Sequence, residues 1–166
     1  MKKVFSGVFV VMALFLVSCG PTVDQAIEHN DAIVADQKEV LNFREEVADL
    51  VFDMAEPSEI NKKFDEYSSY LATMVDKYEK MPAFDKTDVF RTAMIDFLKS
   101  YKGVCDNQFK TFVKLYQTPP SEEAPELEEQ IDALAGEIDE LENKSLQIFI
   151  QQQEVFSNEY GFKLVE

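Results

Sequence analysis

Several residue types on which metal, cofactor and catalytic sites depend are scarce in this sequence. The 166-residue chain has one His, two Cys, no Trp and only five Gly. A ferritin-like di-metal bundle needs two Glu-x-x-His pairs, and covalent haem attachment needs a Cys-x-x-Cys-His motif; the sequence contains neither. We therefore expect no metal and no cofactor, and His29 is interpreted as an ordinary residue of the first helix.

Basic residues are also scarce. The chain has 16 Lys and Arg against 32 Asp and Glu, a formal net charge of -16. Binding to nucleic acid depends on a basic surface that displaces counterions from phosphates. This composition excludes nucleic acid as a partner, whereas a hydrophobic fraction of 46% favours one folded domain over a disordered chain.

The one long apolar run is at the N-terminus. Met1-Lys2-Lys3 is followed by an almost uninterrupted apolar stretch over residues 4–17. A helix that spans a bilayer needs about 20 apolar residues, so this stretch is short for a membrane anchor. Its length and its basic start are typical of a signal peptide; an uncleaved N-terminal membrane helix is the alternative.

The end of this run is part of a specific motif. Leu16-Val17-Ser18-Cys19 resembles the lipobox of bacterial lipoproteins, and in this motif and its general build the chain resembles small helical envelope lipoproteins of unknown function. The resemblance implies removal of residues 1–18, diacylglyceryl transfer to the Cys19 thiol and acylation of the new amino group. Two or more acyl chains anchor a protein stably to a membrane.

The residue after the motif bears on location. Gly20 stands where an Asp would retain a lipoprotein in the inner membrane of enteric bacteria, so the same resemblance favours the outer membrane. Which face of that membrane the protein occupies is left open.

The second cysteine, Cys105, has no partner once Cys19 is lipidated. One thiol forms neither an intramolecular disulfide nor a cysteine-rich zinc site. Because Cys105 falls on an apolar helix face, we expect a buried thiol with a raised pKa that behaves as a small hydrophobic group. No catalytic residue is assigned.

Proline and glycine divide the rest of the chain into helices. Thr22 and Gln25 can form a capping box, and residues 19–21 leave only a short tether before it. The helices are predicted over about 22–56, 58–81, 85–118 and 121–160.

Apolar residues recur at alternating spacings of three and four in the last three segments. The predicted seam of the third helix comprises Phe90, Met94, Phe97, Tyr101, Cys105, Gln108, Phe112 and Leu115. That of the fourth comprises Leu127, Ile131, Leu134, Ile138, Leu141, Ser145, Ile148, Gln152 and Val155. These seams predict an all-α, antiparallel up-and-down four-helix bundle. The alternative is a three-helix hairpin in which the second segment continues into the third.

Acidic residues gather near the start of the fourth helix. Between residues 121 and 142 there are ten acids and no Lys or Arg. Up-and-down order places this stretch at the end of the bundle far from the tether. We interpret this run first as a solvated helix face whose acids are favoured by the helix dipole. The alternatives are a docking face for a basic protein partner, formed by Glu126, Glu128, Glu129 and Asp132, and a weak cation site.

The first helix predicts polar groups inside the bundle. Adjacent apolar pairs repeat every seven residues in this helix and form a stripe along one face. A helical projection places polar residues within that stripe, so they should point into the bundle. We predict an internal polar track formed by Asn30, Gln37 and Arg44 with Tyr101 and Gln108. The expected partner of Arg44 is Tyr67, Tyr70, Gln108 or a nearby carboxylate such as Asp132. The track could fix helix register or bind a ligand.

These observations lead to three candidate functions, given in order of preference. The first is a non-catalytic, lipid-anchored envelope protein that presents an acidic bundle to a protein partner. The second is a binding protein for a small apolar ligand in a cavity lined by Phe97, Tyr101 and Phe64. An enzyme is third.

Overall fold

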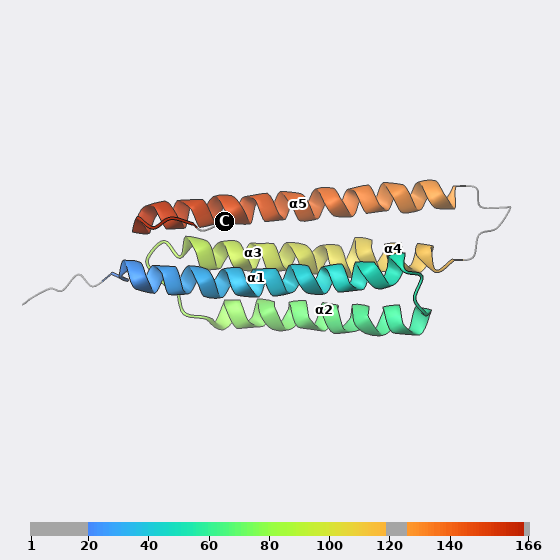
Figure 1. Ribbon diagram of the computed structural model, residues 1–166, viewed down its shortest axis with the longest axis horizontal. Coiled ribbons are helices and arrows are strands. Elements are labelled where there is room, and N and C mark those ends of the chain that lie inside the picture. Colours follow the sequence, from blue (N-terminus) through green and yellow to red (C-terminus); the bar gives the residue numbers. More distant parts are fainter. Residues whose placement is uncertain (1–19, 119–125, 165–166) are drawn as a thin grey trace, which may run out of the picture.

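The computed structural model describes residues 20–118 and 126–164. In these residues the chain is an all-α up-and-down bundle of four helical rods (Figure 1). The helices are α1 (Val23–Phe52), α2 (Pro57–Lys80), α3 (Val89–Val104), the π-helical turn η1 (Cys105–Phe109), α4 (Lys110–Tyr116) and α5 (Leu127–Tyr160). The segments α3, η1 and α4 are continuous and form the third rod. The predicted fold class is confirmed.

Successive rods run in opposite directions (Figure 1). The start of α1, the loop of residues 81–88 and the end of α5 lie together at one end of the bundle, which we call the N-terminal end. The turn of residues 53–56, the end of α4 and the start of α5 lie at the other end, the far pole. Since α2 and α3 are antiparallel and separated by a loop, the three-helix alternative is wrong.

Local signals set the start of α1 but not its end. The Gln25 amide donates to Thr22 Oγ1 at 3.3 Å, and the Thr22 amide donates to Gln25 Oε1 at 2.9 Å, so the capping box is confirmed. The helix ends at Phe52, four residues before the predicted end. Met54 then adopts a left-handed conformation (φ 53°), and Pro57 begins α2, where its missing N–H costs nothing.

The third rod differs from its prediction in two ways. It begins at Val89 rather than at Asp85 or Thr87, after Asp88 in a left-handed conformation (φ 49°). Its middle is a π-helical turn, which adds a residue to one turn and so rotates every later side chain around the axis. As a result Phe109 and Val113 are buried, while Gln108 is only half-buried.

The rotation of α5 was predicted wrongly in its second half. Ile148 and Val155 of the predicted seam are 46% and 49% exposed, and Phe149 and Phe156 occupy the core instead. Their ring centroids lie 5.2 Å and 5.4 Å from that of Phe90. Burying two phenyl rings removes more apolar surface from water than burying Ile and Val, so the aromatic face faces inward.

The start of α5 is Leu127 in the described residues. The predicted starts, Ser121 and Pro125, lie outside them, as do the signal peptide, the lipobox and Cys19. No helix in the described ranges is long and apolar enough to cross a membrane.

Candidate functional site

An ion pair joins the middle of α1 to α5. Arg44 Nε donates to Glu142 Oε2 at 2.9 Å, and Arg44 Nη2 lies 3.6 Å from Asp139 Oδ1. The Arg44 and Glu142 side chains are only 24% and 11% exposed, whereas Asp139 is largely in solvent. A nearby carboxylate was one of the predicted partners of Arg44, and the structure shows that this carboxylate is Glu142 rather than Asp132. Sequence analysis placed Glu142 only in the acidic run.

The environment of this pair is mixed. Burial raises the pKa of Glu142, and the charge and hydrogen bond of Arg44 oppose that shift. The Arg44 guanidinium also lies 5.7 Å from the centroid of the Phe109 ring, a cation–π distance. Phe109 reaches this position because the π-helical turn rotates it toward α1 and α5.

Three further polar groups are buried in the core. Burial raises the pKa values of Tyr67, Tyr101 and Cys105, and the charge of Glu142 adds to each increase. The Cys105 pKa rises to about 12, so its thiol stays protonated at neutral pH. The buried Tyr67 hydroxyl has no hydrogen-bond partner among the described residues. Together with Arg44 and Glu142, these three form what we call the polar centre, which draws on every rod.

The predicted polar track is not continuous. Asn30 is buried, and its Oδ1 accepts from Gln153 Nε2 of α5 at 2.9 Å. Gln37 is buried as well. Tyr101 lies in the core, but Gln108 donates from η1 to Glu137 Oε1 at 3.0 Å and does not reach α1.

Polar bridges at two levels therefore connect α1 to α5, one at Asn30 and one at Arg44. Sequence reasoning identified the α1 members from their place between apolar pairs. It missed Gln153 and Glu142, because the predicted rotation of α5 was wrong.

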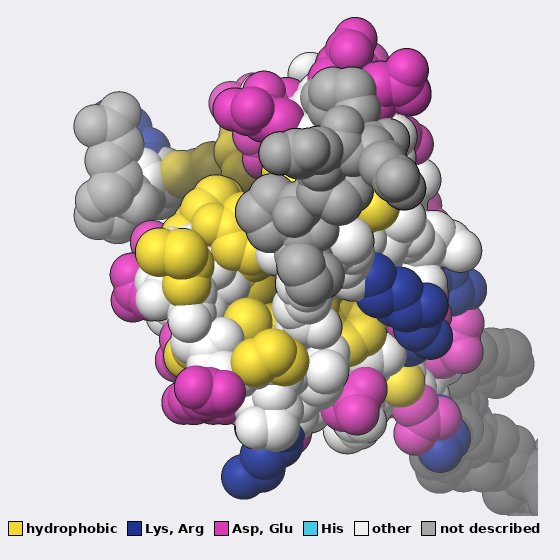
Figure 2. All heavy atoms as spheres, turned by 90° about the vertical axis from the view of Figure 1, so that its right-hand side faces the viewer, with side chains coloured by type: hydrophobic (Ala, Val, Ile, Leu, Met, Phe, Trp, Pro, Cys, Tyr) yellow, Lys and Arg dark blue, Asp and Glu magenta, His cyan; other side chains and the backbone are white. Residues whose placement is uncertain are grey.

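The predicted acidic docking face lies at the far pole. Its residues Glu126, Glu128, Glu129 and Asp132 are all exposed. Figure 2 views the molecule from this end. It shows acidic side chains gathered over α5 and exposed hydrophobic side chains below them.

Exposed apolar residues share the far pole. Phe52 is 61% exposed and Met54 is 79% exposed. The Phe52 ring meets the rings of Phe112 and Tyr116 edge-on, with centroids 6.5 Å and 6.4 Å apart. Sequence analysis missed this apolar surface because it expected α1 to remain helical through Glu56.

A groove between α1 and α2 borders the same pole. It has a volume of about 440 Å³, and its walls include Asp49, Asp53 and Glu59 together with Lys62 and Lys63. Both lysines form ion pairs, Lys63 with Glu46 and Lys62 with Glu66. The groove adds further carboxylates to the pole, and its own basic groups are already paired.

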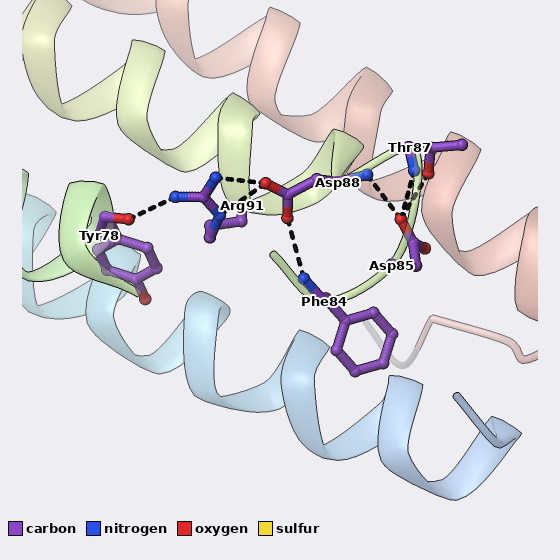
Figure 3. Close-up of polar contacts among 6 residues, drawn as sticks. All are labelled: Tyr78, Phe84, Asp85, Thr87, Asp88 and Arg91. Carbon is purple, nitrogen blue, oxygen red and sulfur yellow. Dashed lines mark hydrogen bonds and ion pairs between the residues drawn. The ribbon is translucent and has the colours of Figure 1, made fainter. Parts of the chain in front are cut away.

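The N-terminal end is closed by a hydrogen-bonded loop (Figure 3). Asp88 Oδ1 accepts from the Phe84 amide at 3.1 Å, and its Oδ2 accepts from Arg91 Nε at 2.7 Å. Asp85 accepts from the Asp88 and Thr87 amides at 2.6 Å and 2.8 Å. These bonds offset the cost of the left-handed Asp88 backbone.

The loop also seats an aromatic contact. The Phe84 ring stacks on His29 of α1, with centroids 4.3 Å apart. Burial lowers the pKa of His29, although the charges of Asp88 and Asp85 act against that shift. His29 is thus part of the packing at the N-terminal end.

The cavity predicted for an apolar ligand is not assembled around its three residues. Phe64 and Tyr101 are buried in the core, and Phe97 borders a hollow between α3 and α5 beside Ser100 and Leu141. Within residues 20–118 and 126–164, no three His, Cys, Asp or Glu side chains are placed to hold a metal ion.

Comparison with protein-family models, curated proteins and solved structures gives no significant match for this chain.

Proposed function

We propose that this chain is a non-catalytic, lipid-anchored protein of the bacterial envelope whose far pole docks a basic protein partner. The observation behind this proposal is that exposed Phe52 and Met54 share one end of the bundle with an exposed acidic helix start. Protein interfaces combine an apolar centre with a polar rim. A strongly acidic rim attracts a basic partner and accelerates its encounter.

The tether gives this pole its orientation. In the proposal Cys19 is lipidated, and only Gly20 and Pro21 separate it from the cap of α1. A helix of 30 residues is about 45 Å long at 1.5 Å per residue. The far pole would therefore project away from the membrane, and the outer membrane is the proposed location because Gly20 follows the lipid-bearing cysteine.

The state of the polar centre supports a non-catalytic role. A nucleophile or general base must be accessible and must titrate near the working pH. Burial moves the pKa values of Tyr67, Tyr101 and Cys105 upward, toward forms that stay protonated, and all three are sealed in the core. We therefore assign the polar centre to the packing of the bundle.

The test is site-specific photo-crosslinking in cells that produce the full chain. A photoreactive amino acid at Met54 should give a discrete crosslinked adduct, and the same group at the exposed Thr73, on the side of α2, should not. Neutralising Glu126, Glu128, Glu129 and Asp132 to Gln or Asn should reduce that adduct, and so should added salt.

A charge-matched variant separates position from net charge. Neutralising the exposed acids Asp24, Glu28, Glu154 and Glu159, which lie toward the N-terminal end, should leave the adduct unchanged. Equal adduct yields from Met54 and Thr73, or a yield insensitive to both salt and the far-pole acids, would contradict the docking proposal.

A further inference from the structure

Another concave surface lies toward the N-terminal end of the bundle, between α1 and the C-terminal segment. After Gly161, which adopts a left-handed conformation (φ 73°), the chain turns back along the bundle (Figure 1). The Phe162 amide donates to the Ser157 carbonyl at 3.1 Å, and the Phe162 ring packs against Phe156. These contacts hold the segment of residues 162–164 over the gap between α1 and α5.

The resulting cleft has a volume of about 440 Å³. Its residues are Ile27, Asn30, Asp31, Val34, Ala35 and Lys38 of α1, Gln153 of α5, and Phe162, Lys163 and Leu164 of the C-terminal segment. Pockets that bind small molecules have volumes of about 300 to 1,000 Å³ and combine apolar walls with a few polar groups. This cleft has both features.

The cleft exists because α1 and α5 face each other through side-chain amides near Asn30. Asn30 and Gln153 hydrogen-bond to each other at 2.9 Å, so α1 and α5 meet here through polar side chains. Branched apolar side chains at the same positions would pack more closely and close the gap between the two helices. The hydrophobic residues beside that bridge, Ile27 and Val34, are consequently only half-buried. The amides form a polar part of the cleft, and aliphatic groups flank them.

Among the described residues that line the cleft, basic side chains outnumber acidic ones. Lys38 and Lys163 are exposed and form no ion pair with any described residue, in a chain with twice as many acids as bases. Asp31 is the one acid among the described residues of the cleft, and it accepts a hydrogen bond from Asn30 Nδ2 at 3.0 Å. The described lining therefore has two lysines and one acid, whereas the whole chain has 16 Lys and Arg against 32 Asp and Glu.

We propose that this cleft binds a single-chain amphiphile with an anionic head group, the chemistry of a fatty acid. The head group lies between Lys38 and Lys163, where each ammonium group donates a charge-assisted hydrogen bond. The hydrocarbon chain covers Ile27, Val34 and Phe162, which removes their exposed apolar surface from water. This site is separate from the far pole and does not depend on the docking proposal.

The experiment uses the full chain in nanodiscs of zwitterionic phosphatidylcholine. Dodecanoic acid bearing a diazirine is added, the sample is irradiated, and labelled peptides are mapped by mass spectrometry. We expect labelling on the peptides that contain Val34 and Phe162. A diazirine-labelled phosphatidylglycerol in a parallel sample tests a two-chain membrane lipid as the ligand, and we expect it to label these peptides less than dodecanoic acid does.

Two variants test the position of the ligand. Ala35→Trp should fill the cleft and abolish the labelling, whereas Ala133→Trp, at an exposed position of α5, should not. Lys38→Glu with Lys163→Glu should weaken labelling about a hundredfold, because two charge-assisted bonds are lost and each is worth about one factor of ten. Lys110→Glu with Lys114→Glu, at exposed positions of α4, makes the same change in net charge and should have no effect.

Three results would overturn the proposal. One is labelling spread evenly over surface peptides, and another is cleft labelling that survives Ala35→Trp. The third is equal labelling by a diazirine-bearing dodecanol, since an uncharged head group would show that the lysines play no part.

Discussion

Arg44 and Glu142, 98 positions apart in the sequence, form a hydrogen-bonded ion pair of 2.9 Å between α1 and α5. Neither residue is held by its neighbours in sequence. The Arg44 guanidinium lies over the aromatic ring of Phe109, a residue of the π-helical turn. Whether this pair stabilises the bundle or mainly selects its register can be tested, because removing one partner and removing both have different consequences.

Replacing Arg44 alone should destabilise the protein. Arg44→Met leaves the Glu142 carboxylate buried without its cation, and we expect the free energy of unfolding to fall by about 3 kcal/mol. Adding Glu142→Leu should recover most of that loss. Urea denaturation followed by circular dichroism measures both effects, and a double variant as unstable as the single one would show that the pair itself stabilises the fold.

The pH dependence of stability should reveal the burial of Glu142. Its pKa in the folded state is raised above the value of 4.5 that we take for the unfolded chain, chiefly by burial. The native state therefore binds the Glu142 proton more tightly than the unfolded state does. The stability contributed by Glu142 must fall as the pH rises from 4.5 through its raised pKa.

The measurement compares the wild type with Glu142→Gln across this pH range. The difference in unfolding free energy, wild type minus variant, should decrease with rising pH and then level off. A difference that increases with pH would mean that attraction to Arg44 outweighs burial.

The rotation of α5 can be tested with two neighbouring residues. Phe149→Ala should cost about 3 to 5 kcal/mol, because it leaves a cavity among the core rings. Ile148→Ala should cost less than about 1 kcal/mol, since that side chain is 46% exposed. Thermal unfolding measures which of the two variants loses more stability. A larger loss for Ile148→Ala than for Phe149→Ala would support the rotation of α5 that sequence periodicity predicts.

The Cys105 thiol should resist alkylation. Burial raises its pKa to about 12, so little thiolate forms at neutral pH. Iodoacetamide should modify the peptide that contains Cys105 only in denaturant, whereas a cysteine introduced at the exposed Thr92 should react under native conditions. Equal rates at the two positions in the folded protein would refute this prediction.

The lipid anchor is tested at Cys19. With Cys19→Ala the acyl acceptor is lost, so the protein should either leave the membrane fraction or accumulate as an unprocessed precursor. Mass spectrometry of the N-terminus and membrane fractionation distinguish these outcomes. Normal processing and unchanged membrane association of the variant would rule out lipidation at this residue.

Features that depend on nearby residues were predictable from the sequence. The Thr22–Gln25 capping box involves residues three positions apart, and the seam of α2 repeats without interruption from Ile60 to Tyr78, so local spacing determines both. The all-α bundle follows from such seams and from prolines between them. The inward-facing Asn30 and Gln37 were also found this way, because the flanking apolar pairs of α1 point in one direction.

The tertiary structure alone decided how α5 is rotated and what Arg44 binds. Along α5 the sequence offers two apolar faces, and only the rings of Phe90 and Phe97 on α3 select the one with Phe149 and Phe156. That choice turns Glu142 and Gln153 toward α1. The π-helical turn and the C-terminal segment over the cleft likewise depend on packing between distant residues. These contacts form between different rods, so the periodicity of apolar residues within one rod cannot predict them.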